Sequence, residues 1–213
     1  MLFDFDKLPS RERYKLAVSC VVPRPIAWVV SQDAEGVVNA APYSFFNVFS
    51  EDPLVLAIGC GPGKPGGKDT LRNIKATGQF VVCMVPETAA EQMNATAVDF
   101  DSGVDEVAEA GLTALPSTKV KPPRIGESPV AMECETFQLI EIGPHTMVLG
   151  KVLAMHIHDD CVMDAEKNYV DTVKLGLVGR MHGRGWYART TDRFDMPRMT
   201  PEEWAAKKAK AAE

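Results

Sequence analysis

Two long runs of β-forming residues, Val130–Glu141 and Thr146–His158, constrain the fold of this chain more than any other feature. Gly-Pro-His at 143–145 lies between them, and this segment is typical of a tight connection. Earlier in the chain, Ile26–Ser31 and Val37–Ala41 flank a polar turn that ends in glycine, which predicts a hairpin. Because hairpins dominate, the sequence predicts a mainly β fold, an antiparallel β-barrel with peripheral helices, and disfavours a doubly wound sheet.

Shorter elements fill the rest of the chain. An apolar strand, Pro53–Cys60, runs into a glycine-rich stretch, and a helix at Leu71–Thr77 follows, with Asp69 or Thr70 as its cap and a glycine as its stop. At 213 residues the chain suits a single domain, 1–213, with a helical tail from about residue 200. We further expect a strand at Gln79–Val85, a surface helix at Glu87–Val98, helix and loop over Asp99–Gly111, and a terminal helix over Pro201–Glu213.

Charge and cysteine content narrow the class of protein. The net charge is −6, and the pI of about 5.3 argues against nucleic acid or an anionic membrane as a partner. The five cysteines are odd in number and form no C-x-x-C pair, which indicates reduced and mostly buried thiols. No apolar stretch is long enough to cross a bilayer, and the N-terminal acids are unlike a signal peptide. We therefore expect a cytoplasmic protein that binds neither nucleic acid nor membrane.

The segment Pro23–Asn47 combines prolines, small residues and aromatic rings with a few polar groups, such as Arg24 and Asn39. Flat rings, close backbone approach and sparse hydrogen-bonding groups suit the wall of a site for a planar heteroaromatic ligand. The alternative is a buried hairpin that ends in a proline-containing turn. The segment alone leaves both interpretations open.

The glycine-rich loop Gly61–Gly66 matches the dinucleotide fingerprint G-x-G-x-x-G after a strand. However, Pro62 and Pro65 restrict the turn, and each removes a backbone N–H from the phosphate cradle. A P-loop also fails, because proline occupies the place of its first glycine. What remains is Lys68–Thr70 at a helix N-terminus, which offers a cation, a hydroxyl and backbone N–H groups to a phosphate. The alternative is a helix cap beside a solvated lysine.

Histidines give no strong signal for a metal or a nucleophile. His156 and His158 alternate on a strand near Cys161, but no matching pair of ligands appears elsewhere, so we expect no metal site. His145 follows a Gly-Pro turn and is a weak catalytic candidate, with a structural role as the alternative. Since no Ser/His/Asp or Cys/His arrangement is present, the chemistry would come from a cofactor.

Five segments are weak signals one by one, but their order along the chain makes the set specific. Together they cover about residues 10–197. They are Pro23–Val29, Asn39–Asn47, Gly66–Ile74, Gly143–His145 with Leu149–Val152, and Val178–Tyr187. In this order they resemble the flavin reductase-like, FMN-binding split-barrel family, which includes flavoredoxins and flavin:NAD(P)H reductase components. Pro144 departs from the family pattern, in which a small acidic residue is more usual before the turn histidine.

The resemblance implies a six-stranded Greek-key split barrel that forms a homodimer, with flavin near the dimer interface. Lys68–Thr70 would receive the phosphate, and a ring of Trp28, Tyr43, Phe45 or Phe46 would cover one flavin face. The residues that it assigns to cofactor binding are Arg24, Ala27, Trp28, Val29, Ala41, Tyr43, Ser44, Phe45, Asn47, Cys60, Lys68, Asp69, Thr70 and Arg180.

The function implied by the resemblance is that of an NAD(P)H-dependent flavin reductase, an oxidoreductase that supplies reduced flavin or electrons to a partner. Its cofactor would be FMN, with FAD as an alternative, and its co-substrate NADH or NADPH. The partner would be a flavin-dependent monooxygenase or a redox protein. Two alternatives stay open: a non-enzymatic electron carrier similar to flavoredoxin, and an FMN-dependent oxidoreductase or oxygenase that acts on an organic substrate.

Overall fold

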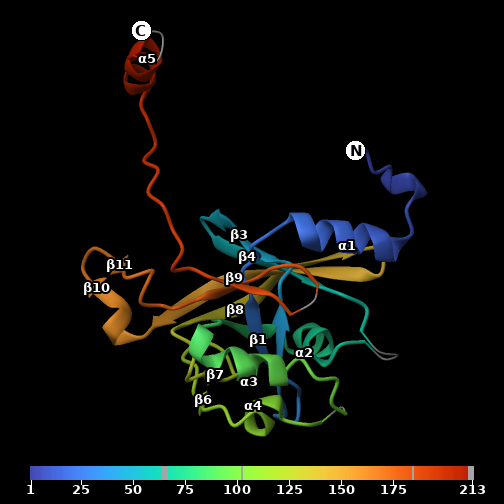
Figure 1. Ribbon diagram of the computed structural model, residues 1–213. Helices are drawn as coiled ribbons and strands as arrows, with labels where there is room; N and C mark the ends of the chain where they lie inside the picture. The colour runs from blue at the N-terminus through green and yellow to red at the C-terminus, as the bar shows by residue number, and fades with distance from the viewer. Residues whose placement is uncertain (64–66, 102, 184, 211–213) are drawn as a thin grey trace.

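The computed structural model describes residues 1–63, 67–101, 103–183 and 185–210 (Figure 1). Residues 64–66 and Arg184, which belong to motifs discussed above, lie outside the described residues, as does the end of the tail beyond 210. The helical elements are η1 (Phe5–Lys7), α1 (Ser10–Cys20), α2 (Asp69–Thr77), η2 (Glu87–Ala89), α3 (Ala90–Ala95), α4 (Glu106–Glu109), η3 (Asp159–Cys161) and α5 (Pro201–Lys210). The strands are β1 (Ala27–Gln32), β2 (Val38–Tyr43), β3 (Phe46–Glu51), β4 (Leu54–Cys60), β5 (Gln79–Met84), β6 (Ala114–Leu115), β7 (Arg124–Ile125), β8 (Val130–Ile142), β9 (His145–Ile157), β10 (Val162–Asp164), β11 (Tyr169–Val170), β12 (Val178–Arg180) and β13 (Tyr187–Arg189).

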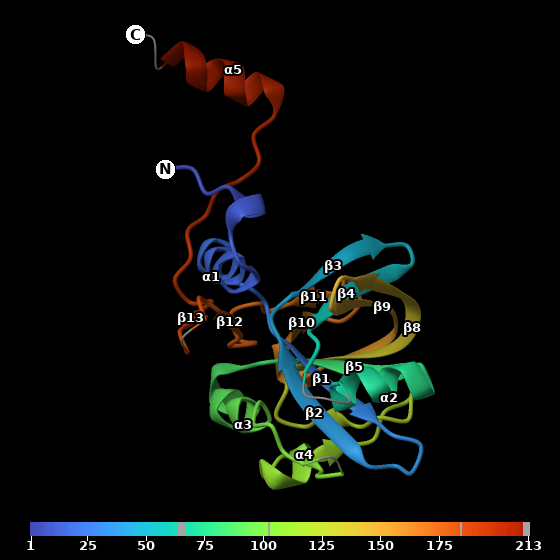
Figure 2. The ribbon, with the colours of Figure 1, turned by 90° about the vertical axis from the view of Figure 1, so that its right-hand side faces the viewer.

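Seven strands form one antiparallel sheet in the order β2-β1-β5-β8-β9-β4-β3. The two edge strands, β2 and β3, are consecutive in the chain, so the sheet curls until its edges approach each other. Figure 2 shows α2, α3 and α4 on one side of the sheet and α1 beside β3 on the other. The predicted mainly β split barrel with peripheral helices is confirmed, and the parallel sheet of a dinucleotide-binding fold is excluded for these strands.

The strand count differs from the six strands implied by the resemblance. The chain bends at Ser44 and Phe45 after β2 and continues as the separate edge strand β3, which the sequence analysis did not predict. In β3, Val48 and Phe49 are consecutive exposed residues beside a bulge, so the alternation that marks a half-buried strand is absent. β2 is also an edge strand, which explains how it tolerates Pro42.

The predicted hairpins are present with small shifts in their bounds. β1 pairs with β2 from Ala27 opposite Tyr43 to Gln32 opposite Val38, and Gly36 in the turn has a positive φ of 95°. In the long hairpin, Ile142 lies opposite His145, so this histidine begins β9 instead of belonging to the connection.

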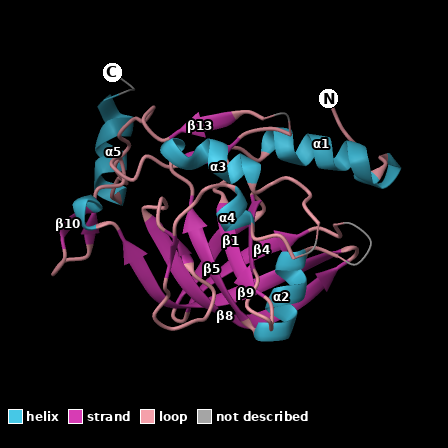
Figure 3. Ribbon diagram, turned by 90° about the horizontal axis from the view of Figure 1, so that it is seen from below, coloured by secondary structure: helices cyan, strands magenta, loops and turns pink. Residues whose placement is uncertain are grey.

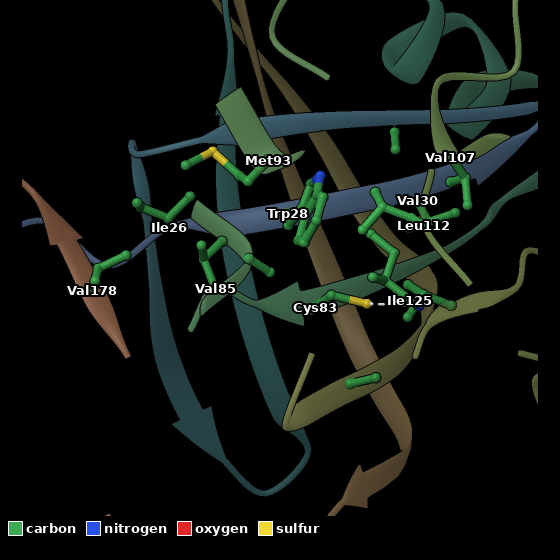
Figure 4. Close-up of a cluster of buried hydrophobic side chains, with 14 of the residues drawn as sticks. Ile26, Trp28, Val30, Cys83, Val85, Met93, Val107, Leu112, Ile125 and Val178 are labelled. Atoms are coloured by element: carbon green, nitrogen blue, oxygen red, sulfur yellow. Dashed lines mark hydrogen bonds between the residues drawn. The ribbon is translucent and has the colours of Figure 1, made fainter. Parts of the chain in front are cut away.

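Strand β1 is buried on both faces, and its alternation divides the core. Trp28 and Val30 point into one cluster, which α3, α4 and the strands β5 and β7 complete (Figure 4). Ala27 and Val29 point to the opposite side, into the barrel interior, where Phe80 is fully buried.

The helices begin and end at residues that differ partly from the prediction. The N-cap of α2 is Lys68, without a side-chain hydrogen bond, so the expected cap at Asp69 or Thr70 is wrong: the Thr70 hydroxyl points to Asn39 instead. Gly78 ends α2 in the left-handed conformation, as expected. The surface helix expected at Glu87–Val98 divides into η2 and α3 with buried residues in both, because this segment covers the Trp28 cluster.

Beyond β13 the chain leaves the body as an extended arm that carries α5 far from the sheet in Figures 1 and 2. Phe194, Met196 and Trp204 of this arm are exposed. Seen from below, α2 and α4 lie in front of the strands (Figure 3). Within the described ranges, no helix is both long enough and apolar enough to cross a membrane.

Candidate functional site

A cavity of about 400 Å³ opens where β2, the start of α2, the segment after α3 and the helix α4 meet. This volume lies in the range typical of small-molecule sites, roughly 300–1,000 Å³. The residues that line it are Asn39, Ala41, Pro42, Tyr43, Gly63, Gly67, Lys68, Asp69, Thr70, Arg72, Thr96, Ala97, Val98, Asp99, Phe100, Asp101 and Glu106. The cavity thus joins the segment Asn39–Asn47 to Lys68–Thr70, which the prediction had placed at the ring and at the phosphate of one ligand.

The floor of the cavity is a chain of buried polar side chains. The amide nitrogen of Asn39 donates to Glu106 Oε1 at 2.8 Å, and the backbone N–H of Ala40 donates to Glu106 Oε2 at 3.1 Å. The Thr70 hydroxyl donates to Asn39 Oδ1 at 2.6 Å, and the Ser31 hydroxyl approaches the same oxygen at 3.3 Å. Burial raises the pKa of Glu106, although these hydrogen bonds oppose that effect. The floor therefore connects β2, α2 and α4.

The end of the cavity at α2 carries positive charge. Among the described residues, no carboxylate forms an ion pair with Lys68, whose Nζ lies 5.9 Å from the centre of the Tyr43 ring. Arg72 is paired with Asp69 at 2.6 Å. Gly63 has a positive φ of 69°, and a Cβ on it would lie 2.7 Å from Lys68 Cγ, so only glycine fits there. A cation, a close backbone approach and the first N–H groups of a helix together suit an anion.

Tyr43 lies at the inner wall of the cavity. Its hydroxyl is buried and forms no hydrogen bond in the described part of the chain. Burial raises the pKa of Tyr43, so this hydroxyl stays a neutral donor. An unsatisfied buried hydroxyl costs about 1–3 kcal/mol, which a ligand acceptor would recover.

Burial raises the pKa of the Cys60 thiol to about 12, although the nearby Lys68 opposes this effect. Cys60 therefore remains a neutral thiol at pH 7 and is unsuited to nucleophilic attack. All five cysteines are free, and Cys20 alone among them is exposed.

The cavity brings together five residues of the predicted cofactor set: Ala41, Tyr43, Lys68, Asp69 and Thr70. The side chains of Ala27, Trp28 and Val29 lie elsewhere, because each is fully buried in the core. The Trp28 indole donates to Thr96 Oγ1 at 2.9 Å, so its ring is unable to cover a ligand in this structure. Alternation along β1 predicts two faces but not which of them a ligand would meet.

Arg24, Ser44 and Arg180 form a second group, away from the cavity lining. The Arg24 guanidinium donates to the carbonyl oxygens of Val18 and Val21, both at 2.7 Å, and to Ser44 Oγ at 3.3 Å. It thereby satisfies carbonyls at the end of α1, where a cation also suits the helix dipole. The backbones of Arg24 and Arg180 exchange two hydrogen bonds, and Arg180 stacks on Tyr187 at 4.7 Å.

The other predicted residues lie outside the cavity lining. Phe45 is 43% exposed and contacts Tyr14, with ring centres 6.2 Å apart. Asn47 is exposed on β3 and accepts a hydrogen bond from its neighbour Val48. His145 is exposed at the start of β9, and its imidazole approaches Gly61.

Sequence reasoning missed three contributors to the site: Glu106, Arg72 and the segment 96–101. Glu106 is one acid among several in a segment without hydrophobic periodicity, so nothing in the sequence distinguishes it. Asn39 was noted as a polar residue, but its link to Glu106 spans 67 positions in the chain. The pair His156 and His158 does not converge on one point, because His156 bonds Glu133 while His158 approaches the Gly126 carbonyl.

Comparison with known proteins gives the family. A family model described as flavin reductase like domain matches residues 18–172. The chain belongs to this family. As a flavin reductase-like protein it joins a family of flavin-binding oxidoreductases, and the resemblance inferred from the sequence is confirmed.

Several relatives resemble this flavin reductase-like protein over nearly its whole length. The 2-nitrobenzoate 2-nitroreductase NbaA of Pseudomonas fluorescens is 37% identical and superposes with a TM-score of 0.86. The superposition covers 94% of this chain and 98% of that chain. Nitrilotriacetate monooxygenase component B from Bacillus cereus is 28% identical and superposes with a TM-score of 0.86. The superposition covers 92% of this chain and 98% of that chain. An uncharacterized protein of Deinococcus radiodurans is 42% identical over 207 residues, which cover 95% of this chain and 91% of the relative.

Proposed function

We propose that this protein is a flavin-dependent oxidoreductase that binds FMN in the cavity between β2 and α2 and uses NADH or NADPH as its reductant. The observation that carries the proposal is the arrangement of Lys68 and the N-terminus of α2 at one end of a 400 Å³ cavity. This arrangement fits a ligand with a single terminal phosphate, because the lysine faces no carboxylate at ion-pair distance in the described part of the chain. FAD would require a further anion site beyond the one that these residues offer.

Two features of the protein test the fit of a flavin independently of the family. The buried Tyr43 hydroxyl forms no hydrogen bond with the residues that the structure describes, and a bound ligand can supply an acceptor. At Gly63 a Cβ would clash with Lys68, so the glycine lets the loop backbone lie directly against the lysine that we assign to the phosphate. In this proposal Ala41 and Tyr43 line the ring and ribityl part, while Lys68 and the first backbone N–H groups of α2 hold the phosphate.

A bound flavin would supply the redox chemistry: it accepts a hydride from a reduced nicotinamide and passes electrons onward. The protein would bind and orient the ring system and exclude water from it. Neither Cys60 nor Tyr43 is suited to act as a base, because burial raises the pKa of both groups. His145 stays a candidate for contact with the nicotinamide, since it lies beside Gly61 at the glycine-rich loop.

The acceptor of the electrons is the second part of the proposal. Similarity to the monooxygenase component B from Bacillus cereus favours delivery of reduced flavin to a partner monooxygenase. Similarity to the Pseudomonas fluorescens nitroreductase favours direct reduction of an organic substrate. NADH and NADPH oxidation with either free FMN or a nitroaromatic acid as acceptor separates these roles. Slow oxidation with both acceptors, together with tightly held FMN, would favour an electron carrier.

We also propose a homodimer. Val48 and Phe49 are exposed on β3, which is an edge strand with unpaired backbone groups, and Phe45 is exposed next to it. Exposed apolar edges are normally covered, and a second copy of the same edge would cover this one symmetrically. Phe49→Glu should convert the dimer to a monomer in light scattering. An unchanged mass would contradict this interface.

The flavin site is tested by the visible spectrum of the purified protein before and after dialysis, followed by titration with FMN. Lys68→Ala should weaken FMN about 10- to 100-fold, the effect of one charged hydrogen bond, and riboflavin less than twofold. Lys75→Ala is the matched control, because Lys75 lies on the same helix but pairs with Glu141 outside the cavity. Protein that takes up no FMN would refute the proposal, and equal weakening of both flavins would refute the role of Lys68.

A further inference from the structure

The carboxylate of Glu106 is buried, yet among the described residues no cation forms an ion pair with it. Only 6% of the residue is exposed, and the partners of its two oxygens are the Asn39 amide and the Ala40 backbone. A buried carboxylate is costly unless hydrogen bonds compensate it, so packing alone does not explain an acid at this position. Its surroundings therefore indicate a role in the cavity floor.

The direction of each hydrogen bond in the floor follows from Glu106. An ionised carboxylate only accepts, so the Asn39 side chain must turn its NH₂ group toward Glu106. The Asn39 carbonyl oxygen then faces Thr70 and accepts the hydrogen of the Thr70 hydroxyl at 2.6 Å. This hydrogen is therefore committed to the protein, and toward the cavity the Thr70 oxygen can only accept.

We propose that Glu106 is a positioning residue that sets the hydrogen-bond direction of the cavity floor and thereby prevents the Thr70 hydroxyl from donating to the ligand phosphate. The inference rests on the proposed function, because it concerns the phosphate of a bound FMN. It reassigns Thr70 within the phosphate-binding segment: the charge of the phosphate is met by Lys68 and backbone N–H groups, and the Thr70 side chain is an internal donor.

Replacing the carboxylate with an amide reverses the donor and acceptor roles along the hydrogen bonds of the cavity floor. The Ala40 backbone N–H is always a donor, so in Glu106→Gln the new carbonyl oxygen must take the position of Oε2. The new NH₂ group then faces Asn39, which satisfies it by turning its carbonyl oxygen toward residue 106. The Asn39 NH₂ group now donates to Thr70, and the Thr70 hydrogen becomes available to a phosphate.

The test is a double-mutant cycle of Glu106→Gln and Thr70→Val, read as the ratio of the FMN and riboflavin dissociation constants. In the wild-type background, Thr70→Val should change this ratio less than twofold. In the Glu106→Gln background, the same substitution should lower the preference for FMN about fivefold, the value of one hydrogen bond. Glu109→Gln removes an equal charge from the exposed face of α4 and serves as the control.

A fivefold loss of FMN preference on Thr70→Val in the wild-type background would overturn the inference, because the hydroxyl would then already donate to the phosphate. An effect of Thr70→Val that is the same in both backgrounds would also overturn it. Thermal melts confirm that each variant is folded before titration. If the wild-type protein binds FMN with a Lys68-dependent preference and the cycle shows no coupling, only this inference fails, whereas failure to bind any flavin refutes the proposed function itself.

Discussion

Glu133 offers a sharp test of how the fold is held together, at a distance from the proposed flavin site. Its carboxylate is fully buried on β8 and accepts hydrogen bonds from three consecutive backbone N–H groups, those of residues 118–120, and from His156 Nε2. These four bonds use the whole acceptor capacity of a carboxylate. The side chain therefore fixes the loop that connects β6 to β7.

In Glu133→Gln the amide oxygen retains two of the backbone donors, and the new NH₂ group faces the N–H of Thr118, which is left without an acceptor. One orphaned N–H costs about 1–3 kcal/mol, and loss of charge from the remaining bonds adds about 1 kcal/mol, so we expect about 3 kcal/mol in total. For a chain of this length that corresponds to a melting temperature lower by about 6–12 °C.

Urea unfolding of the wild type, Glu133→Gln and Glu135→Gln measures this effect. Glu135 lies on the same strand but forms an exposed ion pair with Lys151 at 3.1 Å, which contributes about 0–1 kcal/mol. A Glu133→Gln variant as stable as the Glu135 control would refute the reasoning.

The pH dependence gives a second check on Glu133. Burial alone would raise the pKa of Glu133, but the loop N–H groups and His156 outweigh it and lower the pKa. A lowered folded pKa adds stability that is present above the unfolded value and lost as the pH falls through the folded one. The stability difference between wild type and Glu133→Gln should therefore narrow below about pH 4.5. A difference that widens on acidification would contradict the assignment.

Two further predictions concern the core. Trp28→Phe should destabilise the protein by about 2 kcal/mol through loss of the hydrogen bond to Thr96. The FMN dissociation constant should change less than twofold. Weaker FMN binding at unchanged stability would place the indole at the flavin. Of the five thiols, Cys20 alone should react rapidly with an aromatic disulfide reagent in the folded protein, because burial raises the pKa of Cys60 and Cys83 to about 12; rapid reaction of two or more thiols would contradict this.

Local patterns predicted much of the fold. The β-forming composition of Val130–Glu141 and Thr146–His158, with a turn between them, indicated the longest hairpin, and Gly78 marked the end of α2. These signals depend on neighbours in sequence, which is why they were readable. β3 was missed because it lacks such a local signal: its exposed Val48 and Phe49 break the alternation that a half-buried strand shows.

The candidate site was only partly predictable. Lys68, Asp69 and Thr70 were found because a helix start after a glycine-rich loop is a local signal, and all three line the cavity. Trp28 was assigned to the ligand although its side chain lies in the core. Alternation separates the two faces of a strand, but it does not show which neighbours each face meets. Glu106 was not found at all, since its role arises from contact with Asn39, 67 positions away.

By itself, the sequence determined the antiparallel β architecture, the family and the position of the segment that we propose to bind a phosphate, because each depends on spacing within a short stretch of chain. The tertiary structure alone decided which side chains face the cavity and in which direction its hydrogen bonds run. In our proposal that direction depends on one buried carboxylate, which meets Asn39 and Ala40 of β2 only after the chain has folded. Hydrogen-bond donors and acceptors must match in space, and a linear pattern carries no record of that matching.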